Sequence, residues 1–514
     1  MTMLAPSLSM PRLRVNIIAN FVGRSSSLLL GMLFTPLYLH FLGVEAYGLI
    51  GFHLTLQGAL GFLELGLSRA CNRELARYSG SGPDVHQAMG DTLRSLEAVY
   101  WLVALILGCF MALAAPWIAT SWLKASAIPD ETLVSVLRTM ALIVALRWPV
   151  GLYNGAMMGM QRHVQLNLVK CVISLLGGGG AVLVLWLVRA DVLLYFRWQL
   201  ITACCGLVLY AVFAWRALPG SPLAARVRLE VLRKIIGFSA GVGLNSIMGT
   251  VLRQSDKLIL SAMLPLEQFG YYALASVLAS VVSIAAEAVS GATFPRLSQM
   301  IGAGRSELTV SELYHLACQS VAVVIIPFAL GVAVFSREVL YVYTGRADVI
   351  ENAALLLSIL VIAKVLHASM IVPYALQLAY GWVRLSLLIN AVAILWLPAA
   401  VYLLSGMYGA LGAAVAWLVV TVGYVFVGQP LMFRRLLVGQ YKVWFRGALL
   451  QPGLGVAAFW AFMYWQRCLL PSGRLPLGVA LACLGILSVM VAGWCAPRVR
   501  EKMLRMFRRS LTRG

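Results

Sequence analysis

The sequence predicts an all-α polytopic membrane protein, and two features of its composition support that prediction. Of the 514 residues, 61% are hydrophobic and only 11% are charged, whereas a soluble globular domain carries about 25% charged residues. A helix needs about 20 mostly apolar residues to cross a bilayer, and runs of this length follow one another along the chain. The polar connections between these runs are too short to fold as separate domains.

About fourteen transmembrane helices are expected. The weakest divisions between them fall near residues 188–193 and 404–409, where the connections are very short. The expected spans lie near residues 15–40, 46–68, 93–114, 133–158, 164–188, 192–215, 235–262, 271–294, 314–335, 352–379, 385–404, 409–430, 447–466 and 476–496.

Basic residues are concentrated in alternate connections, and this pattern predicts the orientation of the chain. The formal net charge is +21, but the basic residues lie in short loops between apolar spans, so no nucleic-acid partner is expected. One set of loops holds clusters such as Arg69, Arg73 and Arg77, whereas the opposite set carries acids such as Asp130 and Asp191. Because cytoplasmic loops carry the excess of Lys and Arg, both termini are expected in the cytoplasm.

Cysteine usage and the N-terminal sequence exclude two other interpretations. The nine cysteines form no C-x-x-C pair and no Cys/His cluster, so neither a disulfide framework nor a metal site is expected. Arg12 and Arg14 resemble the start of a signal peptide, but the span after them is too long and contains Arg24. This span is expected to remain as the first transmembrane helix.

A short segment recurs 222 residues later in the chain. Residues 42–48 read LGVEAYG and residues 264–270 read LPLEQFG, and the same offset pairs Gly80 with Gly302. Both copies lie between predicted spans. Parallel internal repeats are typical of transporters whose two halves move around a shared central site, so a duplicated architecture is expected.

Residues 497–514 form a basic tail with apolar residues at a regular spacing. Val499, Met503, Phe507 and Leu511 recur every four residues, and basic residues occupy half of the remaining positions. One interpretation is an amphipathic helix lying on an anionic leaflet. The alternative is a frayed basic tail that only enforces topology.

Polar residues inside the predicted spans fall on single helix faces. In the first span, Asn16, Asn20 and Arg24 recur at four-residue steps, which places them on one face of the helix. A charge at membrane depth costs about 2.5–3.5 kcal/mol on the insertion scale and tends to face a cavity. Arg24 is therefore expected to line a cavity, with an ion pair to a carboxylate that only fixes packing as the alternative. Glu64 is expected to pair with Arg24 or with Arg69.

Later spans carry similar residues. Arg253 and Asp256, three residues apart, are expected to neutralise each other in one interpretation, and Glu287 ends a stripe of serines in the eighth span. The candidate substrate-binding residues are Arg24, Arg147, Lys364, Asn16, Asn20, Asn154 and Arg253. The candidate ion-coupling residues are Glu64, Asp256 and Glu287.

Basic residues outnumber acids inside the spans, so a cavity that they line would be cationic. Guanidinium groups bind phosphate oxygens through paired hydrogen bonds, and a diphosphate is the expected ligand. No P-loop sequence occurs, and the glycines at residues 177–180 lie within a span, where they favour close helix approach or a kink. No cofactor is expected, and a proton or sodium gradient is the candidate energy source.

Several motifs together resemble those of one family. They are Asn16 to Arg24, Leu37-Tyr38-Leu39, the LGxExYG segment at 42–48, Leu65-Gly66-Leu67 with Arg73, Asp256-Lys257, the segment 264–270 and Tyr271-Tyr272. The chain resembles the polysaccharide transporters of the multidrug/oligosaccharidyl-lipid/polysaccharide (MOP) superfamily, the Wzx-type O-antigen and exopolysaccharide flippases. Arg24 fits the basic cavity residues of such relatives by type and depth, and Arg147 and Lys364 fit them by type.

The resemblance implies two six-helix lobes in a V, related by the repeat, with two extra C-terminal helices. It implies a flippase of the bacterial inner membrane that moves an undecaprenyl-diphosphate-linked oligosaccharide to the outer leaflet by alternating access. The implied partners are this lipid-linked substrate, membrane lipid, and the polysaccharide polymerase and chain-length regulator of the pathway. The expected parts are an N-terminal lobe at 1–215, a basic cytoplasmic linker at 216–234, a C-terminal lobe at 235–433, two extra helices at 434–496 and the tail at 497–514.

Three other functions remain as alternatives. A cation-coupled multidrug antiporter of the same superfamily would have a cavity dominated by acids, which the basic excess opposes. An enzyme acting on lipid-linked sugars would present a sizeable outer loop with catalytic residues, and the outward loops here are short, so no enzymatic activity is expected. A purely structural subunit would explain neither the repeat nor the polar stripes.

Overall fold

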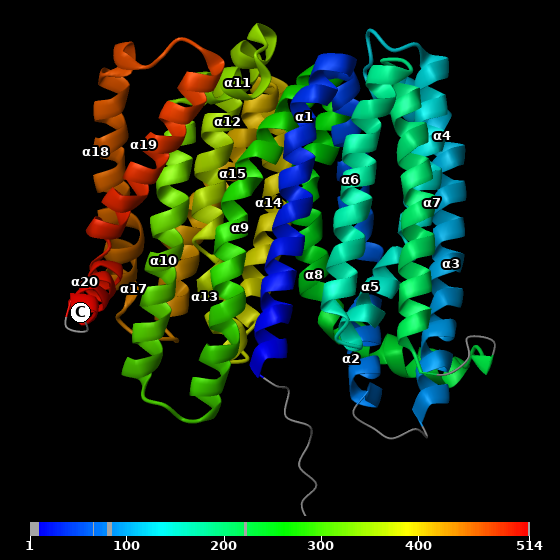
Figure 1. The fold of residues 1–514 in the computed structure, drawn as a ribbon, viewed down its shortest axis with the longest axis horizontal. Coiled ribbons are helices and arrows are strands. Elements are labelled where there is room, and N and C mark those ends of the chain that lie inside the picture. The colour runs from blue at the N-terminus through cyan, green and yellow to red at the C-terminus, as the bar shows by residue number, and fades with distance from the viewer. Residues whose placement is uncertain (1–9, 65, 80–84, 220–223, 512–514) are drawn as a thin grey trace, which may run out of the picture. The chain divides into compact units, whose positions relative to one another are not determined.

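The computed structural model describes residues 10–64, 66–79, 85–219 and 224–511. Within them, the side chains of residues 10–28, 62, 79, 234, 236–246 and 506–511 lie outside the described set. The described chain consists of helices joined by short connections (Figure 1), which confirms the predicted all-α fold. It divides into two compact units, one of residues 1–254 with 265–267 and the other of residues 255–264 with 268–514.

The first unit contains seven helices and the start of an eighth. These are α1 (Met10–Leu60), α2 (Leu67–Ser79), α3 (His86–Trp117), α4 (Asp130–Arg147), α5 (Val150–Gly159), α6 (His163–Leu187), α7 (Val192–Ala217) and α8 (Leu229–Met263). Short 3-10 or π turns extend two of them, at Gly61–Glu64 and Ile118–Trp122.

The second unit contains the end of α8 and the remaining helices. These are α9 (Leu266–Gly302), α10 (Glu307–Val334), α11 (Ser336–Thr344), α12 (Ala347–Ala368), α13 (Ile371–Ala379), α14 (Arg384–Tyr408), α15 (Ala410–Gly423), α16 (Gln429–Phe433), α17 (Tyr441–Trp444), α18 (Gln451–Trp465), α19 (Arg474–Cys495) and α20 (Pro497–Leu511). Further 3-10 or π turns lie at Tyr424–Gly428, Phe445–Leu450 and Arg467–Leu469.

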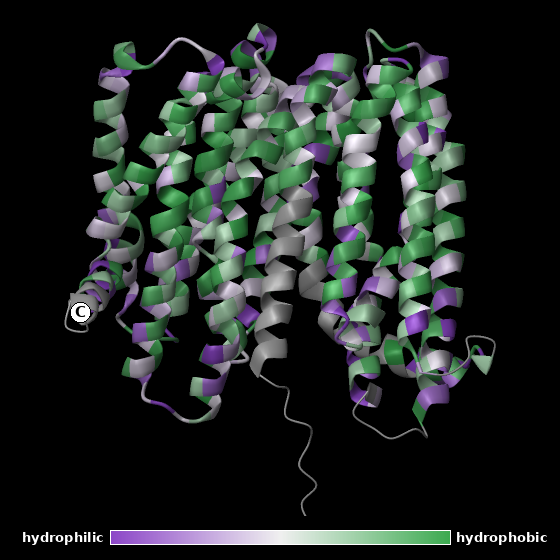
Figure 2. Ribbon diagram, in the orientation of Figure 1, coloured by the Kyte–Doolittle hydropathy of each residue, from purple (hydrophilic) through white to green (hydrophobic). Residues whose placement is uncertain are grey.

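The helices carry apolar surface where lipid would contact them. Among the described residues, twelve helical segments are long and apolar enough to cross a membrane. Hydrophobic residues cover the middle of helices such as α3 and α10, and hydrophilic residues gather at helix ends (Figure 2). Leu113 in α3 and Leu395 in α14 are 81% and 80% exposed, which suits a hydrocarbon environment. The predicted total of about fourteen spans stays a prediction.

A break at Gly43 divides α1 into two segments. Gly43 has φ 79° and ψ 177°, a conformation that glycine adopts without the clash of a side chain. An unbroken helix of 51 residues would be about 76 Å long, more than twice the roughly 30 Å thickness of the hydrocarbon core. The break therefore separates residues 10–42 from 44–60, as expected for two spans.

Helix boundaries repeat along the chain at almost the same offset as the sequence repeat. The break at Gly43 corresponds to Pro265, 222 residues later, between α8 and α9. The starts of α3, α5 and α6 at residues 86, 150 and 163 recur 221 residues later as the starts of α10, α13 and α14. The duplication therefore extends over most of both units.

Two predicted spans, 133–158 and 352–379, are each broken into two helices in the structure. The first break follows α4 at Trp148-Pro149, and the second follows α12 at Ser369-Met370. Pro149 has no N–H to donate and restricts the residue before it, so a new helix starts at Val150. The two breaks occupy equivalent places in the repeat.

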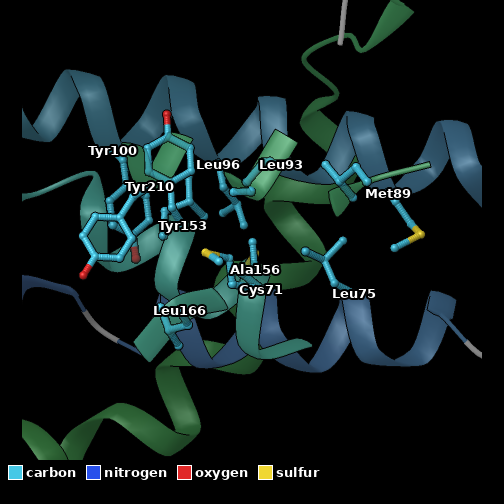
Figure 3. Close-up of a cluster of buried hydrophobic side chains, with 14 of the residues drawn as sticks. Cys71, Leu75, Met89, Leu93, Leu96, Tyr100, Tyr153, Ala156, Leu166 and Tyr210 are labelled. Atoms are coloured by element: carbon cyan, nitrogen blue, oxygen red, sulfur yellow. The ribbon is translucent and has the colours of Figure 1, made fainter. Parts of the chain in front are cut away.

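The core of the first unit is a cluster of buried side chains from α2, α3, α5, α6 and α7. Figure 3 shows Cys71 and Leu75 of α2 facing Leu93 and Leu96 of α3, with Ala156 of α5 beside them. The cluster fixes the short helices α2 and α5 against the long helices, and α5 carries one of the candidate site residues, Asn154.

The glycine run at 177–180 allows α6 to approach α1 closely. A Cβ atom at Gly178 would lie 2.2 Å from Cδ2 of Phe34, whereas one at Gly179 would lie 3.4 Å from its nearest neighbour, Cζ of the same ring. The Tyr38 hydroxyl also donates to the carbonyl of Gly178, at 3.1 Å. The run therefore serves helix packing, in line with the interpretation favoured by the sequence.

We expect Gly178→Ala to destabilise the protein and Gly179→Ala to have little effect. Both substitutions increase helix propensity by the same amount. The difference in stability between the two variants therefore reports the contact with Phe34. Overpacking of this kind costs about 1–3 kcal/mol. Thermal unfolding of the two purified variants in detergent measures it, and equal midpoints would contradict the close packing of α6 on α1.

Candidate functional site

Arg147, the last residue of α4, is held among neutral groups in the first unit. Its guanidinium donates to the side-chain oxygens of Gln57 of α1, at 3.4 Å, and Gln199 of α7, at 3.2 Å. No carboxylate lies within ion-pair distance of it among the described residues. The positive charge of Arg147 is therefore oriented by amides but not neutralised by an acid.

The amides that hold Arg147 are themselves fixed. The side-chain nitrogen of Gln57 lies 2.8 Å from Nε2 of His53, and that of Gln199 donates to the carbonyl of Gly177 at 3.0 Å. Because each amide uses its nitrogen elsewhere, its oxygen is left to face Arg147. Residues of α1, α4, α6 and α7 thus hold one guanidinium in a defined direction.

Asn154 lies in α5, just after the break that follows Arg147. Its side-chain oxygen is buried and has no hydrogen-bond partner among the described residues. Such an orphan acceptor is uncommon in folded proteins, and it suits a site that receives a donor from a bound molecule.

Glu64 lies in the same unit in the turn Gly61–Glu64. The Tyr100 hydroxyl donates to its carboxylate at 3.2 Å. The predicted partner Arg24, with Asn16 and Asn20, lies on α1 outside the described side chains, so that pairing stays a prediction. The contact with Tyr100 was not anticipated.

A buried acid of α3, Glu97, was missed in the sequence. It accepts hydrogen bonds from Tyr153, at 2.9 Å, and Trp215, at 2.7 Å, and pairs with Arg94 at 2.8 Å. Because Tyr153, Trp215 and Arg94 all bind it, Glu97 serves to stabilise the helices that it joins.

A small pocket in the second unit contains Lys364 and Asp256. It is lined by Asp256, Lys257, Ser276, Leu360, Ala363, Lys364, His367 and Trp417. Its cavity volume, counted as the space that the centre of a water molecule can occupy, is about 10 Å³. This volume holds about one water molecule. The structure therefore brings two of the predicted site residues to one place.

Asp256 of α8 is 2% exposed, and its Oδ1 has no hydrogen-bond partner among the described residues. The Tyr272 hydroxyl donates to Oδ2 at 2.6 Å, and the ammonium of Lys257 lies 3.6 Å from Oδ1. In one interpretation of the sequence, Arg253 neutralises Asp256. Arg253 is exposed and its guanidinium donates to Thr250 at 3.1 Å, and its pairing with Asp256 stays a prediction.

Aromatic rings surround the cationic part of the pocket. The ammonium of Lys364 lies 5.3 Å from the ring centroid of Trp417, within the range of a cation–π contact. His367 meets the same ring edge-on at 6.4 Å. Trp417 was not singled out in the sequence, because an aromatic residue in an apolar span carries no distinctive signal.

The side chains of Arg253 and Glu287 are exposed. Neither residue is among those that line this pocket.

The fold matches that of known transporters. The lipid II flippase MurJ, in an inward closed conformation, has a TM-score of 0.70 at 11% identity, covering 93% of this chain and 98% of that chain. An inward-facing MATE multidrug resistance transporter of the MOP superfamily has a TM-score of 0.61 at 14% identity, covering 80% of this chain and 96% of that chain. The chain therefore has the membrane-transporter fold of the MOP superfamily.

The sequence identifies the family within that fold. The model of the family described as polysaccharide biosynthesis protein matches residues 13–301, more than half of the chain, and the chain belongs to this family. A proposed O-antigen transporter of Shigella flexneri is 21% identical over 389 residues, which are 73% of this chain and 87% of that protein. The predicted family resemblance is confirmed.

Proposed function

We propose that this protein is a flippase for an undecaprenyl-diphosphate-linked oligosaccharide, a repeat unit of O-antigen, exopolysaccharide or a similar glycan. The proposal rests above all on Arg147, a guanidinium within the helical bundle whose hydrogen-bond acceptors are neutral amides. Such a group is ready to bind an anion, because no carboxylate in the described part of the chain pairs with it. A diphosphate offers oxygens with the spacing that a guanidinium binds best.

The other candidate residues receive roles that follow from their chemistry. Asn154 contacts a donor of the bound head group through its orphan oxygen, and Lys364 adds positive charge in the second unit. Arg24, with Asn16 and Asn20 on the same face of α1, extends the cationic surface, and Arg253 is the weakest member because it is exposed. No bond is made or broken in this process, so the protein acts as a transporter and not as an enzyme.

Transport proceeds by alternating access between the cytoplasmic and outer leaflets of the bacterial inner membrane, with both termini in the cytoplasm. A proton or sodium gradient supplies the energy. Asp256 is the best of the three coupling candidates, because its carboxylate is buried in a pocket with room for about one water. Glu64 is bound by Tyr100, and Glu287 is exposed. The polymerase and chain-length regulator of the same pathway are the proposed transient partners.

The fold alone also suits a multidrug antiporter, since MATE transporters share it. Arg147 favours the flippase, because an uncompensated guanidinium repels the cationic drugs that such antiporters would export. The two functions therefore predict opposite preferences for substrate charge.

Lipid analysis of a strain lacking the gene separates the two functions. We expect diphosphate-linked oligosaccharide to accumulate on the inner leaflet, to be cleared by the wild-type gene and not by Arg24→Ala. Clearance by both would keep the flippase and assign Arg24 to packing. Unchanged lipids together with altered drug sensitivity would contradict the flippase and favour the antiporter.

A further inference from the structure

The C-terminal helix α20 is docked on the transmembrane helices of the second unit. The backbone N–H of Arg498 donates to the side-chain oxygen of Gln319 of α10 at 2.8 Å. The guanidinium of Arg498 donates to the carbonyls of Ser311 and Glu312, each at 3.2 Å. Three hydrogen bonds thus fix the start of α20 to α10, so a frayed tail does not describe this segment.

The position of α20 places it at a bilayer surface. It begins at Pro497, two residues after α19 ends at Cys495, and α19 is one of the segments able to cross a membrane. A helix that follows a membrane span so closely lies within reach of lipid head groups. Met503 of α20 also packs close to Gly493 of α19. A Cβ atom added at Gly493 would lie 3.3 Å from the methyl group of Met503.

The described part of α20 beyond Arg498 is exposed and mostly basic. Arg500, Lys502 and Arg505 are exposed, and Glu501, which pairs with Arg505, is the one acid of the tail. The guanidinium of Arg500 lies 5.9 Å from the ring centroid of Trp494 in α19, an exposed tryptophan of the kind found at membrane interfaces. In total, residues 497–514 hold seven basic residues.

Apolar side chains accompany these charges. Met503 and Leu504 are each 42% exposed, and the other exposed residues of α20 up to residue 505 are charged. Exposed apolar side chains next to basic ones suit the boundary between head groups and acyl chains, where each type has a favourable environment. Water would favour only the charged residues, and a protein interior would favour only the apolar ones.

We propose that α20 is a binding site for anionic phospholipid, with Arg500, Lys502 and Arg505 on the phosphate-bearing head groups and Met503 and Leu504 in the acyl boundary. The charge of the helix and its place beside α19 select a lipid surface over an acidic protein. Because Arg498 ties α20 to α10, lipid bound there also stabilises the docked position of the helix.

Native mass spectrometry of the full chain in detergent tests this site. The protein is offered phosphatidylglycerol and phosphatidylethanolamine together, and the ratio of bound anionic to zwitterionic lipid is measured. The test variant is Arg500→Gln/Lys502→Gln/Arg505→Gln, which keeps Arg498 and the helix propensity of α20. The control is Arg69→Gln/Arg73→Gln/Arg77→Gln, which removes the same charge from α2.

We expect the α20 variant to lose its preference for phosphatidylglycerol and the α2 variant to keep it. Each basic residue near an anionic surface contributes about five-fold in affinity, so three removed charges weaken binding by up to about 100-fold. Added salt should reduce the wild-type preference as well. An equal loss of the preference for phosphatidylglycerol in both variants would show that only net charge matters. No loss in either variant would favour an acidic protein as the partner of α20. Either result would overturn the proposal.

Discussion

Replacing Arg147 with alanine is expected to abolish flipping while leaving the protein folded. The guanidinium is the group proposed to bind the diphosphate, and its partners Gln57 and Gln199 are neutral amides whose side-chain oxygens can accept hydrogen bonds from water in its place. A hydrogen bond to a charged group contributes about 1.5–3 kcal/mol, so two lost contacts to phosphate lower substrate affinity by at least ten-fold. Accumulated diphosphate-linked oligosaccharide in cells carrying the variant measures the effect.

A second variant, Arg147→Lys, tests whether the positive charge alone is sufficient for activity. Lysine keeps the charge but lacks the planar pair of donors that reaches two amides and a phosphate together. We expect partial activity from it, and activity near wild type from Arg253→Ala, because Arg253 is exposed and lies outside the pocket of the second unit. Full activity of Arg147→Ala at normal abundance would remove Arg147 from the substrate site.

Replacing Lys257 with methionine is expected to destabilise the second unit strongly. It removes the ammonium 3.6 Å from the buried carboxylate of Asp256 and keeps the hydrogen bond from the Tyr272 hydroxyl. Breaking a buried ion pair on one side costs about 3–5 kcal/mol. Thermal unfolding in detergent measures this loss.

The double variant Asp256→Asn/Lys257→Met provides the control for that experiment. Removing both charges leaves no isolated ion, and such replacements are often close to neutral. Its midpoint should therefore return most of the way to wild type. A double variant as unstable as the single one would show that Lys257 contributes packing and not charge compensation.

The membrane fold was predictable because its signals are local. Apolar runs marked the helices, and the repeated segments at 42–48 and 264–270 marked the duplication before any boundary was known. The breaks after Arg147 and Ala368 were not predicted, because a continuous transmembrane helix and a broken one have the same apolar composition. Only Pro149 gave a local signal, and proline alone does not end a membrane helix.

The candidate site was predictable by residue type but not by partner. Arg147 and Asp256 were singled out because charges are rare inside apolar spans. Their partners were not found, since Gln57 and Gln199 lie 90 and 52 residues from Arg147, and single-sequence patterns do not report such distances. For Asp256, the structure shows Lys257 and Tyr272 as partners, and helical spacing had suggested neither of them.

Because the helix breaks are duplicated, residues at matching positions in the two halves can be compared directly. Arg147 ends α4 and Ala368 ends α12, and Gln199 and Trp417 occupy the same position counted from the starts of α7 and α15. A guanidinium and an amide in one copy thus correspond to a methyl group and an indole in the other. The two halves therefore share one arrangement of helices while only the first carries a positive charge at this pair of matched positions.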